Sequence, residues 1–165
     1  MNITNKFFPK SEKNKIIILT LEINKPHLNI DEFKNFEIMN CYELLEKQNY
    51  DSLNDSNEKR IEYIANEIIN SKINILICDV CFSITDFDKI SELLKPNKLI
   101  INKILVPNES KRKSKLLDGQ EIYRNHSRWL DFYPGQIEEI HEEFEMKIKN
   151  LKTKYKNTET EILEI

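Results

Sequence analysis

The sequence predicts an α/β fold, with three layers (α/β/α) around a mainly parallel sheet and a long helix towards the C-terminus. Short runs rich in β-branched residues predict buried strands at 15–20, 73–80 and 99–106. The segments between these runs carry apolar residues at helical spacing. Strands and helices that alternate in this way are typical of βαβ units. Right-handed crossovers then place helices on both faces of the sheet.

The chain of 165 residues has the length of one domain, and no linker divides it. We expect the core to span about 15–150 and the tail, 157–165, to be frayed. Only 2 glycines are present, Gly119 and Gly135, and both lie in the C-terminal third. This scarcity argues against a glycine-rich phosphate loop or a dinucleotide fingerprint.

The smaller elements between the first two long strands are predicted from caps and breakers. Asn29 is a good N-cap for a short helix over 29–36, and 36–39 has the composition of a short strand. Residues 42–47 form a turn or two of helix. The polar segment 48–57 is a loop.

Two amphipathic helices flank the second long strand. Asp55 and Glu58 have the spacing of a capping box ahead of the first helix. Its apolar face consists of Ile61, Ile64, Ala65, Ile68 and Ile69. Thr85 and Asp86 can cap the second helix, which Pro96 ends.

The pattern changes after the third long strand. A basic run at 111–115 precedes a predicted turn at Asp118–Gly119, and a second turn is predicted at Pro134–Gly135. A long helix begins at about Gln136, with one apolar stripe made of Ile137, Ile140, Phe144, Ile148, Leu151 and Tyr155. Its acids come early and its lysines late. This order complements the helix dipole, and it also fits a partner-binding helix that extends past the core.

Composition excludes several classes of protein. Lys+Arg 25 against Asp+Glu 28 gives a net charge of −3, which argues against a nucleic-acid binder. The longest apolar run, 16–19, is far too short to span a membrane, and the first ten residues lack a signal-peptide core. We therefore expect a cytoplasmic protein.

The cysteines and histidines predict no metal centre and no cofactor. Cys78 and Cys81 have CxxC spacing, but they follow an apolar strand, whereas a redox motif opens a helix. These two cysteines and Cys41 are therefore predicted to be reduced, structural thiols. A redox or metal-binding role is the alternative. The single histidines have no partner at motif spacing and are His27, His126 and His141.

The order of elements over 15–106 resembles the P-loop kinases, in particular the small-molecule kinases related to adenylyl-sulfate kinase. The resemblance is best over 57–90, where the helix with Ile61, the strand 73–78 and the Phe82–Ser83 step follow one another at similar spacing. It also includes the acidic segment Asp86-Phe87-Asp88-Lys89. The resemblance implies a P-loop-kinase-like fold and places Ser83 beside the nucleotide site.

The chain departs from this family where the phosphate loop should be. A P-loop needs glycines, a lysine and a Ser/Thr hydroxyl directly after the first strand. Here Leu21 and Pro26 replace the glycines, His27 replaces the lysine and Leu28 replaces the hydroxyl. Lys25 lies two positions early. The acceptor-handling Asp and Arg after the second strand are also missing. We therefore expect no phosphoryl transfer by the usual route.

Five residues remain as candidates for ligand binding. Asp79 ends a central strand, where it can hold a ligand or cap a loop. Ser83 is a candidate because the resemblance places it beside the nucleotide site. Arg112, Arg124 and Arg128 lie in the region that resembles the kinase lid, where two of them could form an anion site. The alternative is that these arginines pair with neighbouring acids. The aromatic residues nearby suit a core anchor better than a base-stacking platform and are Trp129, Phe132 and Tyr133.

The sequence thus predicts a non-catalytic protein of P-loop-kinase-like fold that binds a partner protein or a small anionic ligand. The alternative is a phosphoryl- or sulfuryl-transferring enzyme with a rearranged, arginine-rich site. A third hypothesis, a structural or antagonist protein of a mobile element, rests on size and on the absence of motifs.

Overall fold

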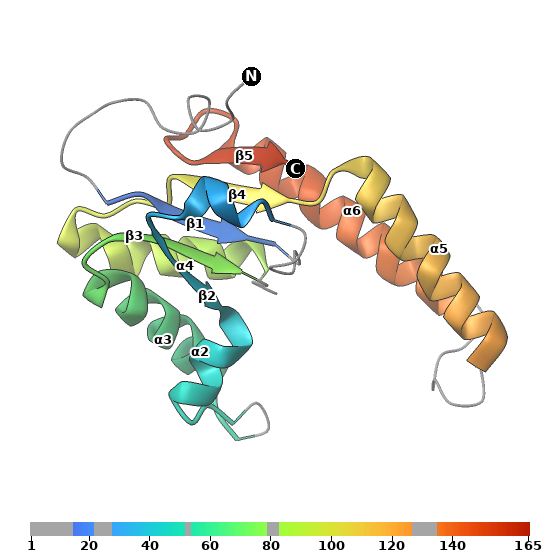
Figure 1. The fold of residues 1–165 in the computed structure, drawn as a ribbon, viewed down its shortest axis with the longest axis horizontal. Coiled ribbons are helices and arrows are strands. Elements are labelled where there is room, and N and C mark those ends of the chain that lie inside the picture. The colour runs from blue at the N-terminus through green and yellow to red at the C-terminus, as the bar shows by residue number, and fades with distance from the viewer. Residues whose placement is uncertain (1–14, 22–27, 52–53, 79–82, 127–134) are drawn as a thin grey trace.

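The structure, a computed structural model, describes residues 15–21, 28–51, 54–78, 83–126 and 135–165. Its elements follow the order β1 (Ile17–Thr20), η2 (Ile30–Phe33), β2 (Phe36–Asn40), α2 (Cys41–Lys47), α3 (Asn57–Asn70), β3 (Asn74–Cys78), α4 (Ile84–Leu94), η3 (Lys95–Asn97), β4 (Lys103–Val106), α5 (Glu109–His126), α6 (Gln136–Tyr155) and β5 (Glu161–Glu164). Figure 1 shows the sheet with helices beneath it and the α5–α6 pair extending from one end.

The sheet has five strands in the order β2-β3-β1-β4-β5, and every neighbouring pair is parallel. The predicted α/β class and parallel sheet are therefore confirmed.

At the amino end of β1, two asparagine side chains accept hydrogen bonds from backbone N–H groups of the chain entering this strand. The Asn74 Oδ1 accepts from Ile16 N at 2.9 Å, and the Asn102 Oδ1 accepts from Ile17 N at 2.7 Å. Strand β4 begins at Lys103 and not at 99 as predicted.

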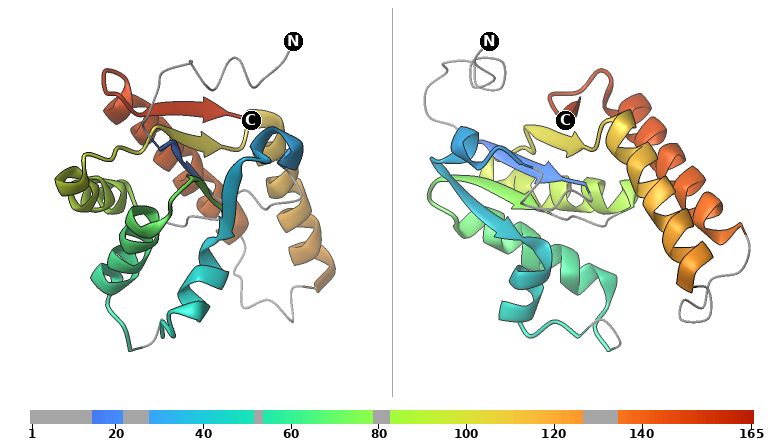
Figure 2. Two further views of the ribbon diagram at one scale, coloured as in Figure 1. Left: turned by 60° about the vertical axis from the view of Figure 1, so that its left-hand side comes forward. Right: turned by 45° about the vertical axis from the view of Figure 1, so that its right-hand side comes forward.

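The two faces of the sheet are covered differently. Helices α3, α4 and α6 pack on one face, where Phe87, Ile90 and Leu151 are buried with the inward side chains of the strands. On the other face, Leu28 and Phe33 pack over alternate strand residues. Among the described residues this second layer consists of η2 and its neighbours (Figure 2). The prediction of helices on both faces thus differs from the observed layering, since only Ile30–Phe33 of the predicted helix 29–36 is helical, as a 3-10 helix.

The tail is ordered into a strand and not frayed. The Glu161 N donates to Asn102 O at 3.0 Å and the Ile165 N donates to Val106 O at 3.0 Å, so β5 extends the edge of β4. Ile162 packs towards the helical core and Leu163 towards the opposite face. This alternation of apolar side chains holds the tail on the sheet.

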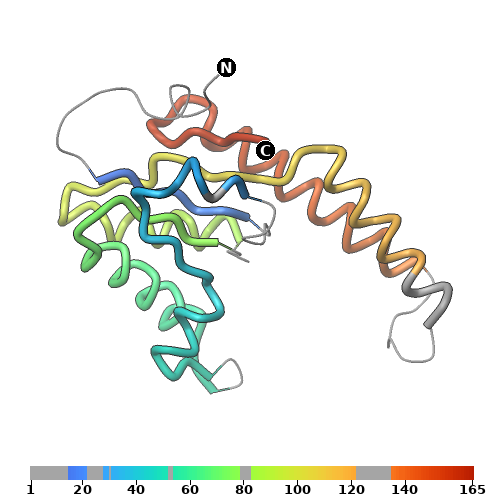
Figure 3. The backbone as a smooth tube through the Cα atoms, viewed as in Figure 1, coloured from blue at the N-terminus to red at the C-terminus, as the bar shows by residue number. Residues whose placement is uncertain are grey.

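Helix α5 is continuous where a turn was predicted at Asp118–Gly119. A Cβ added at Gly119 would lie 3.1 Å from the Ile137 side chain, so the missing side chain allows α5 and α6 to approach closely. The second predicted turn is present: Gly135 has φ 89° and precedes α6, which starts at Gln136 as expected. Helices α5 and α6 form an antiparallel hairpin (Figure 3).

Candidate functional site

Open α/β sheets bind ligands where the chain leaves two neighbouring strands towards opposite faces, at their carboxyl ends. Strands β1 and β3 are such a pair. The chain after β1 leads to Leu28 and Phe33 on one face, whereas β3 leads to α4 on the other face. The sequence analysis predicts that Asp79 and the segment 21–28, which stands where a phosphate loop would be, lie at this edge of the sheet. Residues 22–27 and 79–82, and therefore Asp79 itself, lie outside the described residues.

The two ends of segment 21–28 are fixed by buried apolar side chains. Leu21 is 0% exposed and packs in the helical core, and its N–H donates to Leu105 O at 2.7 Å. Leu28 is 7% exposed and packs on the opposite face of the sheet. In the resemblance described from the sequence, these two positions correspond to the first glycine and the magnesium-binding hydroxyl of a phosphate loop. In the structure both are core positions.

Ser83 and Asp86 form a capping box at the start of α4. The Asp86 Oδ2 accepts from Ser83 N at 2.8 Å, and the Ser83 hydroxyl lies 2.7 Å from the Thr85 hydroxyl. The predicted cap of this helix is thus correct for Asp86, but Ser83 takes the N-cap position and Thr85 does not. The structure places Ser83 in a helix cap at the carboxyl edge of the sheet.

Asp86 also joins α4 to α3. The Asn57 Nδ2 donates to Asp86 Oδ1 at 2.8 Å, and Arg60 Nη2 lies 3.8 Å from Asp86 Oδ2. Burial of the carboxyl opposes its ionisation. The hydrogen bonds from Ser83 and Asn57 and the charge of Arg60 outweigh that effect and hold the pKa of Asp86 below its usual value. Asp86 is therefore an ionised structural group, and sequence spacing identified only its role as a cap.

We expect Asp86→Asn to lower the free energy of unfolding at neutral pH by about 1–2 kcal/mol, because the amide cannot accept all the bonds of the carboxylate. The folded-state pKa of Asp86 is lowered, so its contribution is present above the unfolded pKa and disappears as pH falls through the folded value. Urea unfolding of both proteins at pH 7 and near pH 3 checks this. An equal difference at both pH values would show that ionisation of Asp86 is not involved.

Arg112 is buried, with 7% exposure, and is fully engaged in the fold. Its Nε donates to Glu145 Oε1 at 2.5 Å and its Nη1 donates to Pro107 O at 2.6 Å. The same Nη1 lies 3.4 Å from Glu164 Oε1. The hydrogen bond and charge of Glu145, with help from Glu164, raise the pKa of Arg112 despite burial. The guanidinium thus connects α5 with α6 and β5.

Of the three candidate arginines, only Arg112 has a side chain among the described residues. Arg124 lies in α5 twelve residues after Arg112, a rise of about 18 Å along the helix. Arg128 lies outside the described residues, as do His27, Trp129, Phe132 and Tyr133. For Arg112, the interpretation as a partner of acidic residues is the one that the geometry supports.

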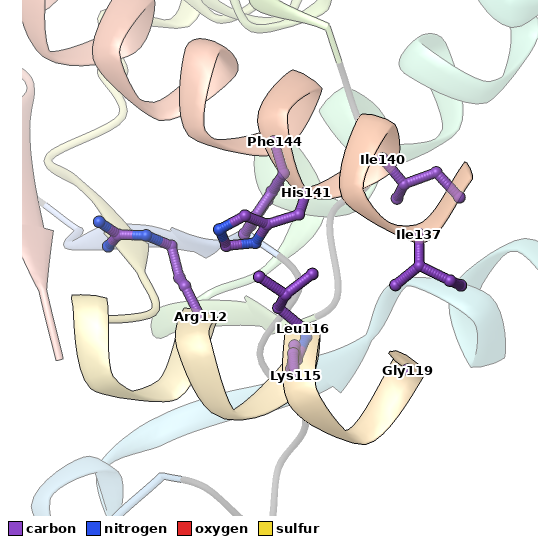
Figure 4. Close-up of a pocket in the computed structure, with 8 residues that line it drawn as sticks. All are labelled: Arg112, Lys115, Leu116, Gly119, Ile137, Ile140, His141 and Phe144. Atoms are coloured by element: carbon purple, nitrogen blue, oxygen red, sulfur yellow. The ribbon is translucent and has the colours of Figure 1, made fainter. Parts of the chain in front are cut away.

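A cavity of about 310 Å³ lies between α5 and α6 (Figure 4). Its lining combines four apolar side chains with three that carry nitrogen, and consists of Arg112, Lys115, Leu116, Gly119, Ile137, Ile140, His141 and Phe144. The Nε2 of His141 lies 3.8 Å from Glu145 Oε1. Sequence analysis missed this cavity because it placed a turn at Gly119. The signal that could have found it is the apolar stripe of α6, which continues beyond the length needed to cover the sheet.

Other kinds of site are not supported by the described residues. They contain no group of three or more His, Cys, Asp or Glu side chains that could hold a metal ion. Cys41 and Cys78 are buried and not joined in a disulfide. None of the described helices combines the length and the apolar character needed to cross a lipid bilayer.

Comparison of the chain with protein-family models, with curated proteins and with solved structures finds no match.

Proposed function

We propose that this chain is a non-catalytic protein of P-loop-kinase-like fold that has no working ATP site and acts by binding another protein. The observation that carries this proposal is the burial of Leu21 and Leu28 at the two ends of the segment that replaces the phosphate loop. A phosphate loop points consecutive backbone N–H groups at its ligand. Here the Leu21 N–H is already bonded to Leu105 O, and both side chains occupy the core.

Two further features support the proposal. The parallel sheet has a switch point between β1 and β3, where open α/β folds bind ligands. In addition, the α5–α6 hairpin offers a largely apolar cavity away from that edge. The alternative, an enzyme with an arginine-rich site, is weakened because the guanidinium of Arg112 is held by Glu145, Glu164 and a backbone carbonyl.

Isothermal titration of the full chain with ATP–Mg²⁺ and, separately, with adenylyl sulfate tests this proposal. We expect no saturable heat with either ligand up to about 1 mM, which corresponds to less than about 4 kcal/mol of binding free energy. Titration of a known ATP-binding kinase under the same conditions is the control for ligand quality. Micromolar affinity for either compound would overturn the proposal in favour of the transferase.

A further inference from the structure

Strand β5 lies at one edge of the described sheet and pairs with a single neighbour, β4. In contrast, β1, β3 and β4 each lie between two strands, and all four residues of β1 and of β4 are buried. The side chains of β5 are exposed or half-buried. Figure 2 shows β5 (red) beside β4 (yellow) at this edge. The chain thus seats a short strand of its own on the edge of β4.

The backbone of the β4 edge holds residues 161–165, which we call the β5 segment. Glu161 N donates to Asn102 O at 3.0 Å, and Ile165 N donates to Val106 O at 3.0 Å. Ile165 O in turn accepts from Asn108 N at 3.0 Å. Backbone hydrogen bonds of this kind can be made by any extended segment, so the side chains determine which segment is accepted.

The apolar side chains of the β5 segment alternate between the two faces of the sheet. Ile162 packs towards the helical core, whereas Leu163 and Ile165 pack on the opposite face. A strand that occupies this edge therefore gains apolar contacts on both faces when it carries apolar residues at its middle positions.

The two acids of the β5 segment meet cations from three elements. Glu161 pairs with Lys103 of β4, and Glu164 pairs with Lys152 of α6 and, at 3.4 Å, with Arg112 of α5. The side chains of Lys103 and Arg112 are only 9% and 7% exposed. A cation so far from water destabilises the fold unless an anion accompanies it. The β4 edge therefore favours negative charge at two positions of the strand that occupies it.

The spacing of these two acids is specific. Glu161 and Glu164 are three residues apart, so their side chains lie on opposite faces of the sheet, where Lys103 and Lys152 stand. A strand shifted by one residue would place every side chain on the wrong face. The edge thus selects the order acid–apolar–apolar–acid.

We propose that the β4 edge is a binding site for an extended acid–apolar–apolar–acid strand of another protein, and that the β5 segment is the intramolecular ligand that occupies it in this structure. The inference rests on the proposed function, binding of another protein, and names the chemistry of the partner. The partner binds when the β5 segment has left the edge.

The connection between α6 and β5 favours the chain's own edge over that of a second copy. Thr158 Oγ1 donates to Tyr155 O at 3.0 Å, and Thr160 Oγ1 donates to Ile101 O at 2.9 Å. This short connection keeps the β5 segment beside its own β4, at an effective concentration of about 1 mM. The segment therefore competes strongly with a partner strand.

Fluorescence anisotropy of the full chain with a labelled peptide of residues 157–165 tests the site. The variant Glu161→Lys with Glu164→Lys places like charges against the three cations of the edge, so its own β5 segment should leave. We expect this variant to bind the peptide at least about tenfold more tightly than the wild type does. The matched control, Glu142→Lys with Glu143→Lys, changes two exposed glutamates of α6 and the net charge equally, and should bind as weakly as the wild type.

A second peptide tests the spacing of the acids. It carries Leu163→Glu with Glu164→Leu, so it has the same composition but places both acids on one face. It should bind the Glu161→Lys, Glu164→Lys variant at least about tenfold more weakly than the native peptide does. Equal binding of the two peptides would overturn the proposed site, and so would absence of binding to the folded variant. Either result leaves the ATP titration untouched, so it is distinguishable from failure of the proposed function.

Hydrogen exchange of the wild type is a second readout that does not depend on folding of the variant. The amides of Glu161 and Ile165 should exchange at least about tenfold faster than that of Ile75, which donates to Ile16 O inside the sheet. Equal protection would show that the β5 segment leaves only on global unfolding and would overturn the proposal. A wild-type dimer in sedimentation that the Glu161→Lys, Glu164→Lys variant abolishes would also overturn it, in favour of β5 of a second copy.

Discussion

Leu21→Gly is expected to lower the free energy of unfolding by about 3–5 kcal/mol. The Leu21 side chain is 0% exposed and packs with the helical core on one face of the sheet. Its removal costs the lost apolar burial, leaves a cavity and adds backbone freedom to the unfolded chain. For a domain of this length, the melting temperature should fall by about 6–20 °C.

The effect is informative because a glycine at this position is what a phosphate loop requires. If the segment after β1 were a nucleotide-binding loop, glycine in place of Leu21 would relieve backbone strain in that loop. Because Leu21 is a core residue, the same substitution leaves a cavity instead. Leu117→Ala is the control, since Leu117 is 63% exposed on α5 and its truncation should change stability by less than about 0.5 kcal/mol. Chemical denaturation of the three proteins measures the difference. Equal stability of Leu21→Gly and wild type would show that Leu21 does not fill the site.

Arg112→Met is expected to lower the free energy of unfolding by about 2–3 kcal/mol. The substitution keeps most of the volume but leaves Glu145, Glu164 and the Pro107 carbonyl without their shared donor. Breaking a buried ion pair from one side costs about 3–5 kcal/mol. The value expected here is lower because the side chains of Glu145 and Glu164 are 38% and 33% exposed and Glu164 also pairs with Lys152.

Lys113→Ala provides the matched control for Arg112→Met. Lys113 is the next residue in α5, and its ion pair with Glu109 is formed by side chains that are both 66% exposed. Such a surface pair contributes about 0.5 kcal/mol or less. Thermal unfolding should therefore separate the two variants clearly. Unchanged stability of Arg112→Met, together with loss of sulfate or phosphate binding, would favour an anion site over the structural role.

The sequence predicts the parts of the fold that depend on local pattern. The β-branched runs predict β1, β3 and β4, and the 3.6-residue spacing of Ile61, Ile64 and Ile68 predicts α3. Strand β5 was missed because it is only four residues long and its partner, β4, lies 58 residues earlier in the chain. Pairing over that separation depends on the tertiary fold and leaves little trace in the local sequence.

In the candidate site, too, the sequence could not predict contacts between residues that lie far apart in the chain. Ser83 and Asp86 could be recognised as helix-capping residues, but the hydrogen bond from Asn57 to Asp86 joins residues 29 positions apart. Gly119 was interpreted as a turn, because glycine locally favours turns, whereas its role is to let α5 approach Ile137. Arg112 was grouped with Arg124 by proximity in the sequence. The glutamates that hold it, Glu145 and Glu164, are 33 and 52 positions away.

The central claim is that the chain keeps a P-loop-kinase-like frame without a phosphate site, and a site-resolved titration tests it most directly. Amide chemical shifts of the ¹⁵N-labelled full chain are followed as ATP–Mg²⁺ is added up to about 1 mM. The amides to watch are those of Thr20, Leu21 and Ser83, which flank the carboxyl ends of β1 and β3. We predict no saturable shift at these three positions. Saturable shifts concentrated there, with micromolar affinity, would contradict the account.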